Sequence, residues 1–516
     1  MTRNLGIFVL LLALVAGCAE RTPPTGLRVA VIGLDGATWN LLDPWIEEGI
    51  LPNIERIRRE GFSTGLLSVV PPLSAPAWTT AITGTNPGRH GIFNFDHFDR
   101  ERFLPFPATS LDRKTKAVWE YLTESNRRST VVAIPLTSPP DSLNGVMISG
   151  FPHLSETGFT FPPELENELI EYRLHKYGEY LADEHEEEFL NHLYEVRESH
   201  GRVGLDLYRQ KDWDLFWFVF LGTDKVQHFF WKFMDAEQRG DVDPATAERY
   251  RHAIRDFWID VDRLVGEFVE ATDSNTVLFV VSDHGFGPIH REMRVLRWLW
   301  DEGYCDINPT RSRVLYLPHY GGELTINRKD KFPYGVVAPG EEYEQLIAEL
   351  TEKLLAVRDP ANGKRVVSEV FRADRIYSGP HLDEAPDLLF LPEPGYFFGR
   401  GSPMEEGGTF GEPSYTFSAF HDMRGIFLVR GPHVRTGRGE RDLRLLDLAP
   451  TALRLLGETI PLRMDGRPFE GPFEESLEEA APIRFADRPI EREVSDRRIG
   501  EMREKLDKLQ ALPYLR

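Results

Sequence analysis

The chain has little cysteine and lacks the common nucleotide-binding loops. Cys18 and Cys305 are its only cysteines among 516 residues, so a framework of disulfide bonds is excluded as the source of stability. It contains no GxGxxG or P-loop motif, no internal repeat and no coiled coil of useful length. With 41% hydrophobic and 28% charged residues, the composition is that of an ordinary globular protein stabilised by its core.

Basic residues are few relative to acidic ones. Lys and Arg number 60 against 82 Asp and Glu, and the formal net charge is -22. Because binding to a nucleic-acid backbone needs clustered Lys and Arg, this balance argues against nucleic acid as a partner. It does not argue against a small phosphorylated substrate, since bound cations would make a site locally positive.

The N-terminal segment is similar to a bacterial export signal. Arg3 precedes an apolar stretch, 5–16, that is too short to span a bilayer as a stable helix. The sequence VAGC ending at Cys18 resembles a lipobox, whose cysteine is acylated and becomes the mature N-terminus. We therefore expect a lipoprotein signal peptide over 1–17 and a flexible tether over 18–26. The folded domain would be exported and anchored to a bacterial membrane, facing the periplasm or the cell exterior; a plain secretory signal is the alternative.

The length of 516 residues predicts one large domain with insertions, or two domains. Apolar runs typical of strands alternate with amphipathic stretches typical of helices. This alternation indicates an α/β fold with a mostly parallel central sheet flanked by helices. We assign the core to three segments, 27–151, 211–291 and 399–473.

The remaining segments interrupt or follow this core. Residues 152–210 are polar, charged and helical in period, and we expect a helical insertion over one face of the sheet. Residues 292–398 hold a helix and short strands and predict an inserted cap. The Gly-rich stretch 393–417 is too long for a routine connector, which favours a lid or binding loop, with disorder as the alternative. Residues 474–516 form a charged C-terminal tail with a terminal helix.

Six side chains that bind metals well lie at the ends of apolar runs. Each run is rich in Val, Ile, Leu and Phe and long enough for one buried parallel strand. In an open α/β sheet, catalytic groups collect just past the carboxyl ends of the strands. Three carboxylates and three imidazoles delivered there could hold two divalent cations, which indicates a metal-dependent hydrolase. The six residues are Asp35, Asp224, His228, Asp283, His284 and His421.

Local spacing supports the same interpretation. Asp224 and His228 are four residues apart, so on the first turn of a helix both side chains share one face, as a metal pair requires. Asp283 and His284 are adjacent and precede Gly285, which predicts a tight turn where neighbouring side chains diverge around one ion. For either pair alone, satisfied polar residues at strand ends are an equal alternative.

Ser74 lies in PPLSAPAWTTAITG, at a predicted turn from an extended segment into a helix. A serine there exposes its hydroxyl beside backbone N–H groups at the positive end of the helix, which suits an anion. The alternative is a helix N-cap, the commonest role of serine in this position. Metal coordination would instead generate an alkoxide at neutral pH and make Ser74 a nucleophile.

As a set, LDG at Asp35, the serine turn with TGTNPGRHGI, TDKVQH, SDHG and the late histidine resemble the alkaline phosphatase superfamily, in particular its type I phosphodiesterase/nucleotide pyrophosphatase-like branch. The resemblance covers the core from about residue 27 to 466. It implies an alkaline-phosphatase-like core with inserted cap or lid regions. It also implies a phosphodiesterase that hydrolyses its substrate through a phosphoserine intermediate.

The resemblance implies a role for each of these residues. One ion would be held by Asp35, Ser74, Asp283 and His284, and the other by Asp224, His228 and His421. Asn94, at a one-residue offset from the branch pattern, would bind a phosphoryl oxygen. The branch usually has threonine as its nucleophile, so serine is a mild departure. Mixed Asp and His ligation favours zinc, with manganese or iron as alternatives.

Related activities are distinguished by single residues. A sulfatase needs arginine where Trp78 stands, so that activity is disfavoured. An alkaline phosphatase proper clamps a phosphate dianion with arginine, and Arg89 is equally consistent with a solvated turn residue. A cation from Arg400 or Arg424 could still reach the site. We therefore expect a phosphodiesterase; the alternatives are a phosphomonoesterase, phosphonate hydrolase or phosphotransferase, or a non-catalytic surface binding lipoprotein.

The substrate is predicted only by class. A small-molecule, lipid-linked or glycan-linked phosphate ester fits the predicted chemistry. Aromatic residues near the site in sequence could line its pocket, and core packing is an equal alternative for each. These residues are Trp39, Trp78, Phe93, Phe95 and His97.

Overall fold

The computed structural model describes residues 25–101, 103–153, 155–175, 185–238, 242–316, 321–402, 408–413 and 417–510. The predicted signal peptide and Cys18 lie outside these residues.

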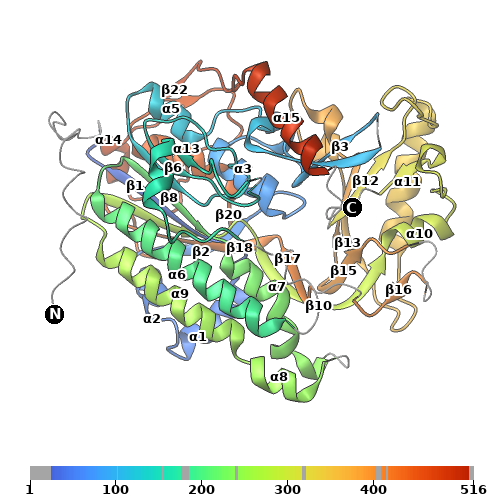
Figure 1. The fold of residues 1–516 in the computed structure, drawn as a ribbon, viewed down its shortest axis with the longest axis horizontal. Helices are drawn as coiled ribbons and strands as arrows, with labels where there is room; N and C mark the ends of the chain where they lie inside the picture. The colour runs from blue at the N-terminus through green and yellow to red at the C-terminus, as the bar shows by residue number, and fades with distance from the viewer. Residues whose placement is uncertain are drawn as a thin grey trace.

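A ten-stranded sheet forms the centre of the molecule, with the strand order β19-β2-β18-β9-β1-β8-β5-β6-β7 and β20 paired to β2 (Figure 1). Its strands are β1 (Arg28–Leu34), β2 (Phe62–Leu67), β5 (Ser129–Val132), β6 (Gly145–Ile148), β7 (Thr160–Phe161), β8 (Leu215–Phe220), β9 (Thr276–Val281), β18 (Arg424–Arg430), β19 (Gly437–Arg438) and β20 (Leu443–Arg444).

The inner strands are parallel, so their carboxyl ends meet at one edge of the sheet. Val31 of β1 pairs with Trp217 of β8 on one side and Phe279 of β9 on the other. The apolar run of β18 predicts a parallel strand as well, and this is wrong, because β18 is antiparallel to both β9 and β2. The chain enters β18 at the carboxyl edge of β9, where Phe427 pairs with Val281, and no crossover returns it to the opposite edge. The start of β18 therefore lies beside the ends of β1 and β9.

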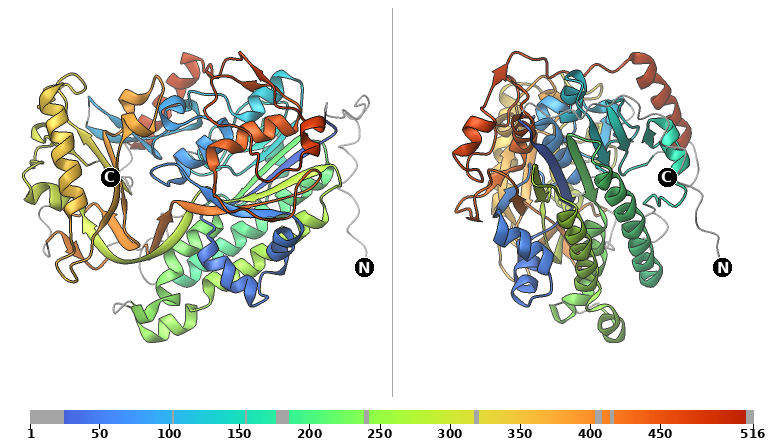
Figure 2. Two further views of the ribbon diagram at one scale, coloured as in Figure 1. Left: turned by 180° about the vertical axis from the view of Figure 1, so that it is seen from behind. Right: turned by 90° about the vertical axis from the view of Figure 1, so that its left-hand side faces the viewer.

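Helices cover both faces of this sheet, as Figure 2 shows from two sides. Along β1, Ala30 and Ile32 pack into the core on one face and Val29 and Val31 into the core on the other. All four are fully buried, and this burial is the main term stabilising the layers. The first face carries α1 (Trp39–Glu47), α2 (Pro52–Glu60), α6 (Glu186–Gln210), α7 (Gly222–Met234) and α9 (Ala253–Glu270). The second carries α3 (Ser74–Thr83), α5 (Val118–Glu124) and α13 (Leu448–Leu455). The predicted α/β fold is confirmed.

A cap with its own hydrophobic core stands at one end of the sheet (Figure 1). Leu324, Leu346 and Phe390 are among the fully buried side chains of that core. The cap sheet has the order β11-β12-β14-β13, from β11 (Val314–Leu315), β12 (Gly322–Ile326), β13 (Val367–Arg372) and β14 (Leu388–Pro392). Its helices are α10 (Val295–Asp301), α11 (Glu341–Ala356) and α12 (Ala373–Ile376), and Cys305 within it is a free, partly buried thiol.

A long strand, β10 (Gly285–Arg294), connects the core with the cap. It pairs with β15 (Gly395–Gly399) and β16 (Phe410–Gly411) near the cap and with β17 (Ala419–Asp422) near the core. The described parts of the Gly-rich stretch 393–417 therefore contribute strands to this connection. β10 also runs through residues 291 and 292, where the sequence places the boundary between core and cap.

The segment predicted as a helical insertion contains α6 but also contributes β7 to the central sheet. In its described earlier part, where the sequence is helical in period, it forms a 3-10 helix, Pro163–Glu168. The Glu166 carboxylate accepts hydrogen bonds from the backbone N–H groups of Gly158 and Phe159, which folds this segment back onto the preceding loop.

The described residues form several further helices and strands. They are α4 (Pro87–His90), α8 (Pro244–Tyr250), α14 (Ser476–Ala480), α15 (Asp496–Gln510), β3 (Asp96–Asp99), β4 (Leu104–Pro107), β21 (Ile460–Pro461) and β22 (Phe485–Ala486). The predicted terminal helix is α15. None of the described helices combines the length and apolar character needed to cross a lipid bilayer.

Candidate active site

A first cluster forms just past the carboxyl ends of β1 and β9. Asp35 follows β1, Asp283 and His284 follow β9, and all three side chains are completely buried. The His284 Nε2 atom lies 3.2 Å from Asp283 Oδ2 and 3.6 Å from Asp35 Oδ1. After Asp35 the chain turns at Gly36, whose φ of +68° favours glycine, and the Gly36 N–H donates to Asp283 Oδ1 at 3.3 Å. Adjacent parallel strands thus bring two carboxylates and one imidazole together.

Ser74 completes this first cluster. It is the first residue of α3, and its Oγ atom lies 3.2 Å from His284 Nε2 and 3.4 Å from Asp35 Oδ1. The N-cap alternative is wrong, because Leu73 occupies the N-cap position and no side-chain capping bond is present there. One turn along α3, the Trp78 indole N–H donates to Asp35 Oδ2 at 2.8 Å. The helix therefore supplies both a hydroxyl and a donor that orients Asp35.

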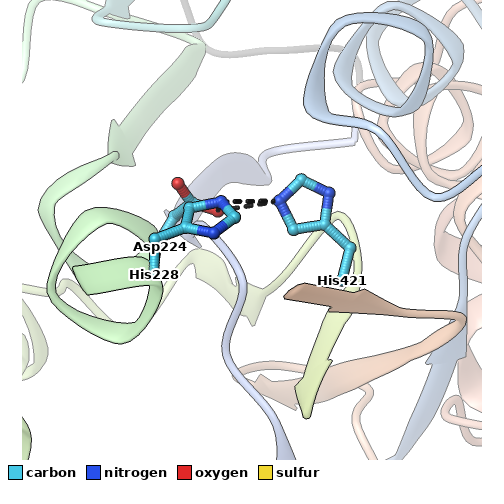
Figure 3. Close-up of side chains that lie close together, drawn as sticks. All are labelled: Asp224, His228 and His421. Carbon is cyan, nitrogen blue, oxygen red and sulfur yellow. Dashed lines mark hydrogen bonds and ion pairs between the residues drawn. The ribbon is translucent and has the colours of Figure 1, made fainter. Parts of the chain in front are cut away.

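The second cluster joins α7 to β17 (Figure 3). Asp224 and His228 lie in the first two turns of α7, four residues apart, and His228 Nε2 is 3.3 Å from Asp224 Oδ1. The His421 Nε2 atom is 3.2 Å from the same carboxylate oxygen and 3.0 Å from His228 Nε2. The His421 and His284 rings stack with their centroids 3.7 Å apart, so the two clusters are neighbours.

The hydrogen bonds of the three imidazoles indicate their tautomers. Each Nδ1–H donates to a backbone carbonyl oxygen: His228 to Ala419 at 2.8 Å, His421 to Pro72 at 2.8 Å and His284 to Gly285 at 3.0 Å. In the neutral rings the Nε2 atoms then carry lone pairs and no proton. Two such lone pairs facing each other at 3.0 Å, beside a carboxylate, repel unless a cation lies between them. The donor set fits a metal ion.

Three residues from each cluster could hold one ion. Within each group, one ligand atom per residue lies within 4.8 Å of the others. The groups are Asp35, Asp283 and His284, and Asp224, His228 and His421. This grouping is the one that the sequence resemblance implies, and the role of each residue as a ligand stays a prediction.

Burial and mutual charge perturb the carboxyl groups strongly. Burial, followed by the nearby Asp carboxylates, raises the pKa of Asp35 and of Asp283 well above the usual range. Burial would also raise the pKa of Asp224, but His228 and Lys225 hold that pKa well below its usual range. The two clusters therefore differ in how well the protein itself supports an ionised carboxylate.

Burial acts on the imidazoles in the opposite direction, because it disfavours their protonated form. It lowers the pKa of His421 to about 4, and it lowers the pKa of His284 well below the usual range. Both rings therefore stay neutral near pH 7, which is the state that a metal ligand needs.

Gly285 serves a different purpose from the tight turn predicted. It begins β10, in which Phe286 pairs with His421 of β17. A Cβ atom at Gly285 would lie 2.2 Å from the Arg424 carbonyl oxygen, so glycine is required for close approach of two backbones. The pairing of β10 with β17 delivers His421 to the site from a short strand of its own.

Asn94 is buried and contacts a residue that sequence analysis missed. Its Oδ1 atom accepts the Phe95 N–H at 2.8 Å, and its Nδ2 atom donates to Glu323 Oε2 of the cap at 3.4 Å. Glu323 lies in β12, within the segment ELTIN. Nothing in that segment distinguishes the carboxyl from an ordinary solvated strand residue.

Two of the three arginines considered as phosphate clamps are paired with carboxylates. The Arg89 Nε atom lies 2.9 Å from Asp465 Oδ1. Arg424 forms a double hydrogen bond with the Asp442 carboxylate, at 2.9 and 3.0 Å. The Arg400 side chain is exposed.

Of the aromatic residues predicted to line a pocket, some pack within the fold and one lines a cavity. The Trp39 indole donates to the Thr64 carbonyl, and Phe93 packs against Tyr377. A cavity of about 530 Å³ lies between the β3–β4 hairpin, the cap and α15, and His97 is the only one of the predicted five among its described lining residues.

Comparison with known proteins gives a family match and similar folds. A type I phosphodiesterase/nucleotide pyrophosphatase family profile matches residues 29–422. A structure of phosphonoacetate hydrolase from Sinorhizobium meliloti with phosphonoacetate is similar at a TM-score of 0.54 and 16% identity, covering 84% of this chain and 96% of that chain. Murine ectonucleotide pyrophosphatase/phosphodiesterase 5 is similar at a TM-score of 0.50 and 15% identity, covering 84% of this chain and 96% of that chain. A comparison with curated proteins by sequence gives no match.

The structural likenesses establish the fold, and the profile establishes the family over most of the chain. The resemblance to the type I phosphodiesterase/nucleotide pyrophosphatase branch read from the motifs is therefore confirmed. The chain belongs to the type I phosphodiesterase/nucleotide pyrophosphatase family, and it is a hydrolase of phosphoric ester bonds.

Proposed function

We propose that the protein is a two-metal phosphodiesterase with Ser74 as its nucleophile. The observation that carries this proposal is the set of three imidazole Nε2 lone pairs directed at buried carboxylates, with the Ser74 hydroxyl 3.2 Å from His284 Nε2 and 3.4 Å from Asp35 Oδ1. A core that had only to be stable would not gather these groups, because buried charges without partners are costly.

Each cluster would hold one divalent ion. Asp35, Asp283, His284 and Ser74 would bind the first, and Asp224, His228 and His421 the second. The mixture of imidazole and carboxylate ligands favours zinc over magnesium or calcium, with manganese or iron as alternatives for metal analysis to decide.

The chemistry assigns a separate task to each residue. When bound, the ions would lower the pKa of the Ser74 hydroxyl and offset negative charge on the phosphoryl group. Ser74 Oγ attacks phosphorus, the P–O bond to the leaving alcohol breaks, and a phosphoserine forms. Water then attacks phosphorus, the bond to Ser74 breaks, and phosphate monoester and free serine result. Asn94 donates a hydrogen bond to a non-bridging oxygen.

A preference for diesters follows from the charges of the residues considered as phosphate-binding groups. A monoester carries one more negative charge near neutral pH and needs a cationic clamp beyond the metals. Arg89 and Arg424 are engaged with Asp465 and Asp442, and Asn94 is neutral. Because both arginines already pair with carboxylates, they support a site suited to the singly charged phosphoryl group of a diester.

We propose the substrate by its chemical class and the location from the predicted lipid anchor. A small-molecule, lipid-linked or glycan-linked phosphate ester fits a protein anchored to a membrane through acylated Cys18, with no nucleic-acid partner. Cys18→Ser should leave an unprocessed precursor or release the protein from membranes. Normal processing with unchanged membrane partition would exclude the anchor.

The function is tested by assaying the purified protein against matched nitrophenyl phosphodiesters, phosphomonoesters, phosphonates and sulfates, with metal content measured on the same sample. We expect about two ions per chain, loss of activity on chelation, and the highest kcat/KM for a diester. One ion or none in the active protein would exclude the two-metal site. A monoester advantage of about tenfold, roughly 1.4 kcal/mol, would exclude the diesterase assignment.

A further inference from the structure

Glu323 is a carboxyl group that the cap buries against the core. Its side chain is only 6% exposed, and its Oε1 atom has no hydrogen-bond partner among the described residues. Its Oε2 atom accepts one hydrogen bond, from Asn94 Nδ2 at 3.4 Å. Burial raises the pKa of Glu323 to about 8. Such a group weakens the fold, since a buried polar atom without a partner costs free energy.

The strand that carries Glu323 separates two environments. Neighbouring side chains of a strand point to opposite faces, so Leu324 packs into the cap core while Glu323 lies on the other face. Thr325 shares that face with Glu323 and lines the cavity between the cap and the β3–β4 hairpin. The face of β12 turned away from the cap core is therefore polar.

The contact with Glu323 fixes the orientation of the Asn94 amide. The amide oxygen is already occupied by the Phe95 N–H at 2.8 Å, so the amide nitrogen faces the cap. That nitrogen carries two hydrogens, and Glu323 accepts one of them. The second is left for an oxygen atom of a ligand.

Asn94 lies in a segment held between the nucleophile helix and the cap. Ile92 and Phe95 pack with Ala75, the residue after Ser74. On the other side, Phe93 packs against Tyr377, which directly follows α12 of the cap, with ring centroids 5.8 Å apart. A shift of the cap against the core would therefore move the Asn94 amide.

We propose that Glu323 is a positioning residue, delivered by the cap, that fixes the Asn94 amide so that its second N–H donates to a phosphoryl oxygen of the substrate. This inference rests on the proposed function, because it assigns Asn94 to the phosphoryl group. The cap then takes part, through Asn94, in binding the reacting group.

The test compares Glu323→Ala, Glu323→Gln, Asn94→Ala and the double variant Glu323→Ala/Asn94→Ala on a nitrophenyl phosphodiester. Glu323→Ala should lower kcat/KM by up to about tenfold, since one orienting hydrogen bond is lost. Glu323→Gln should restore most of this loss, because its amide oxygen accepts the same hydrogen bond. If Glu323 acts through Asn94, the double variant should be no slower than Asn94→Ala alone.

Glu369→Ala is the matched control, because Glu369 is an exposed carboxylate on β13 of the same cap sheet. It should leave kcat/KM unchanged. Independent, multiplying losses in the double variant, or a Gln variant as slow as the Ala variant, would overturn the inference. If Glu323→Ala does not fold, Glu323→Leu completes the same cycle, because leucine fills similar space without an acceptor. Absence of diesterase activity in the unmodified protein would instead overturn the proposed function.

Discussion

The two clusters of candidate ligands differ in how the chain builds them and in the charge they hold. The first takes its candidate ligands from the ends of adjacent parallel strands, and it contains two carboxylates and one imidazole. The second joins a helix to a strand 193 residues further along the chain, and it contains one carboxylate and two imidazoles. Lys225 Nζ lies 3.0 Å from Asp224 Oδ2 in the second cluster. Burial therefore raises the pKa of Asp35 and Asp283 and disfavours their ionised forms. The pKa of Asp224 is lowered instead, because His228 and Lys225 lie beside its carboxylate.

The largest expected effect comes from removing the nucleophile of the first cluster. Ser74→Ala should lower kcat by about a thousandfold or more, because no phosphoserine can form. The second cluster should keep its metal, since Asp224, His228 and His421 are unchanged. Ser74→Thr is the matched control and should retain turnover. Substantial activity of the alanine variant would show that water attacks phosphorus directly.

Replacing one ligand in each cluster tests whether the clusters bind separate ions. Asp283→Asn and Asp224→Asn should each lower the metal content from about two ions per chain to about one. Metal analysis and activity are measured on the same samples. If either substitution removes both ions, the clusters form a single coupled site and the comparison between them fails.

The pH dependence of the chelated protein sharpens the difference in charge. The pKa of Asp283 is raised on folding, so ionisation of Asp283 opposes folding. The free energy of unfolding therefore falls as pH rises above the pKa of Asp in the unfolded chain, about 3.9. The pKa of Asp224 is lowered on folding, so its ionisation stabilises the fold above the unfolded value, and this is lost as pH falls.

In the chelated protein near pH 7, Asp283→Asn should therefore raise Tm and Asp224→Asn should lower it. Both differences should shrink toward acidic pH, where the carboxyl groups of both states are protonated. Thermal unfolding at several pH values with chelator present measures this. Equal shifts of the same sign would show that the clusters do not differ in charge balance.

The smallest effects are expected from neighbours of the ligands. Trp78→Phe removes the donor to Asp35 Oδ2, and Lys225→Met removes the cation beside Asp224 Oδ2. Each should weaken metal binding by about tenfold, and only at its own cluster. Titration with metal distinguishes the two sites if the variants lose affinity in different binding steps. Unchanged affinity would limit both residues to packing.

Sequence patterns predict much of this site because they act locally. The spacing of Asp224 and His228 places both side chains on one face of a helix, and Asp35 follows an apolar run long enough for a buried strand. The sequence also predicts Ser74 at the start of a helix. It cannot distinguish an N-cap from a nucleophile there, because the difference lies in the contacts of the hydroxyl with Asp35 and His284.

The features that sequence could not predict depend on pairing between distant segments. The antiparallel direction of β18, the short strand that carries His421 and the close approach at Gly285 all depend on which strands meet across the sheet. Glu323 was missed because its segment alternates like a solvated strand, and only the docking of cap on core buries it beside Asn94.

The sequence by itself determined the family, the alternation of strands and helices and which side chains are candidate metal ligands, because these depend on residue type and local spacing. The tertiary structure decided how those side chains divide into two clusters, which ring nitrogens are left without a proton and how the cap contacts Asn94. Those features arise from contacts between residues far apart in the chain, and periodicity along one segment carries no information about its partner.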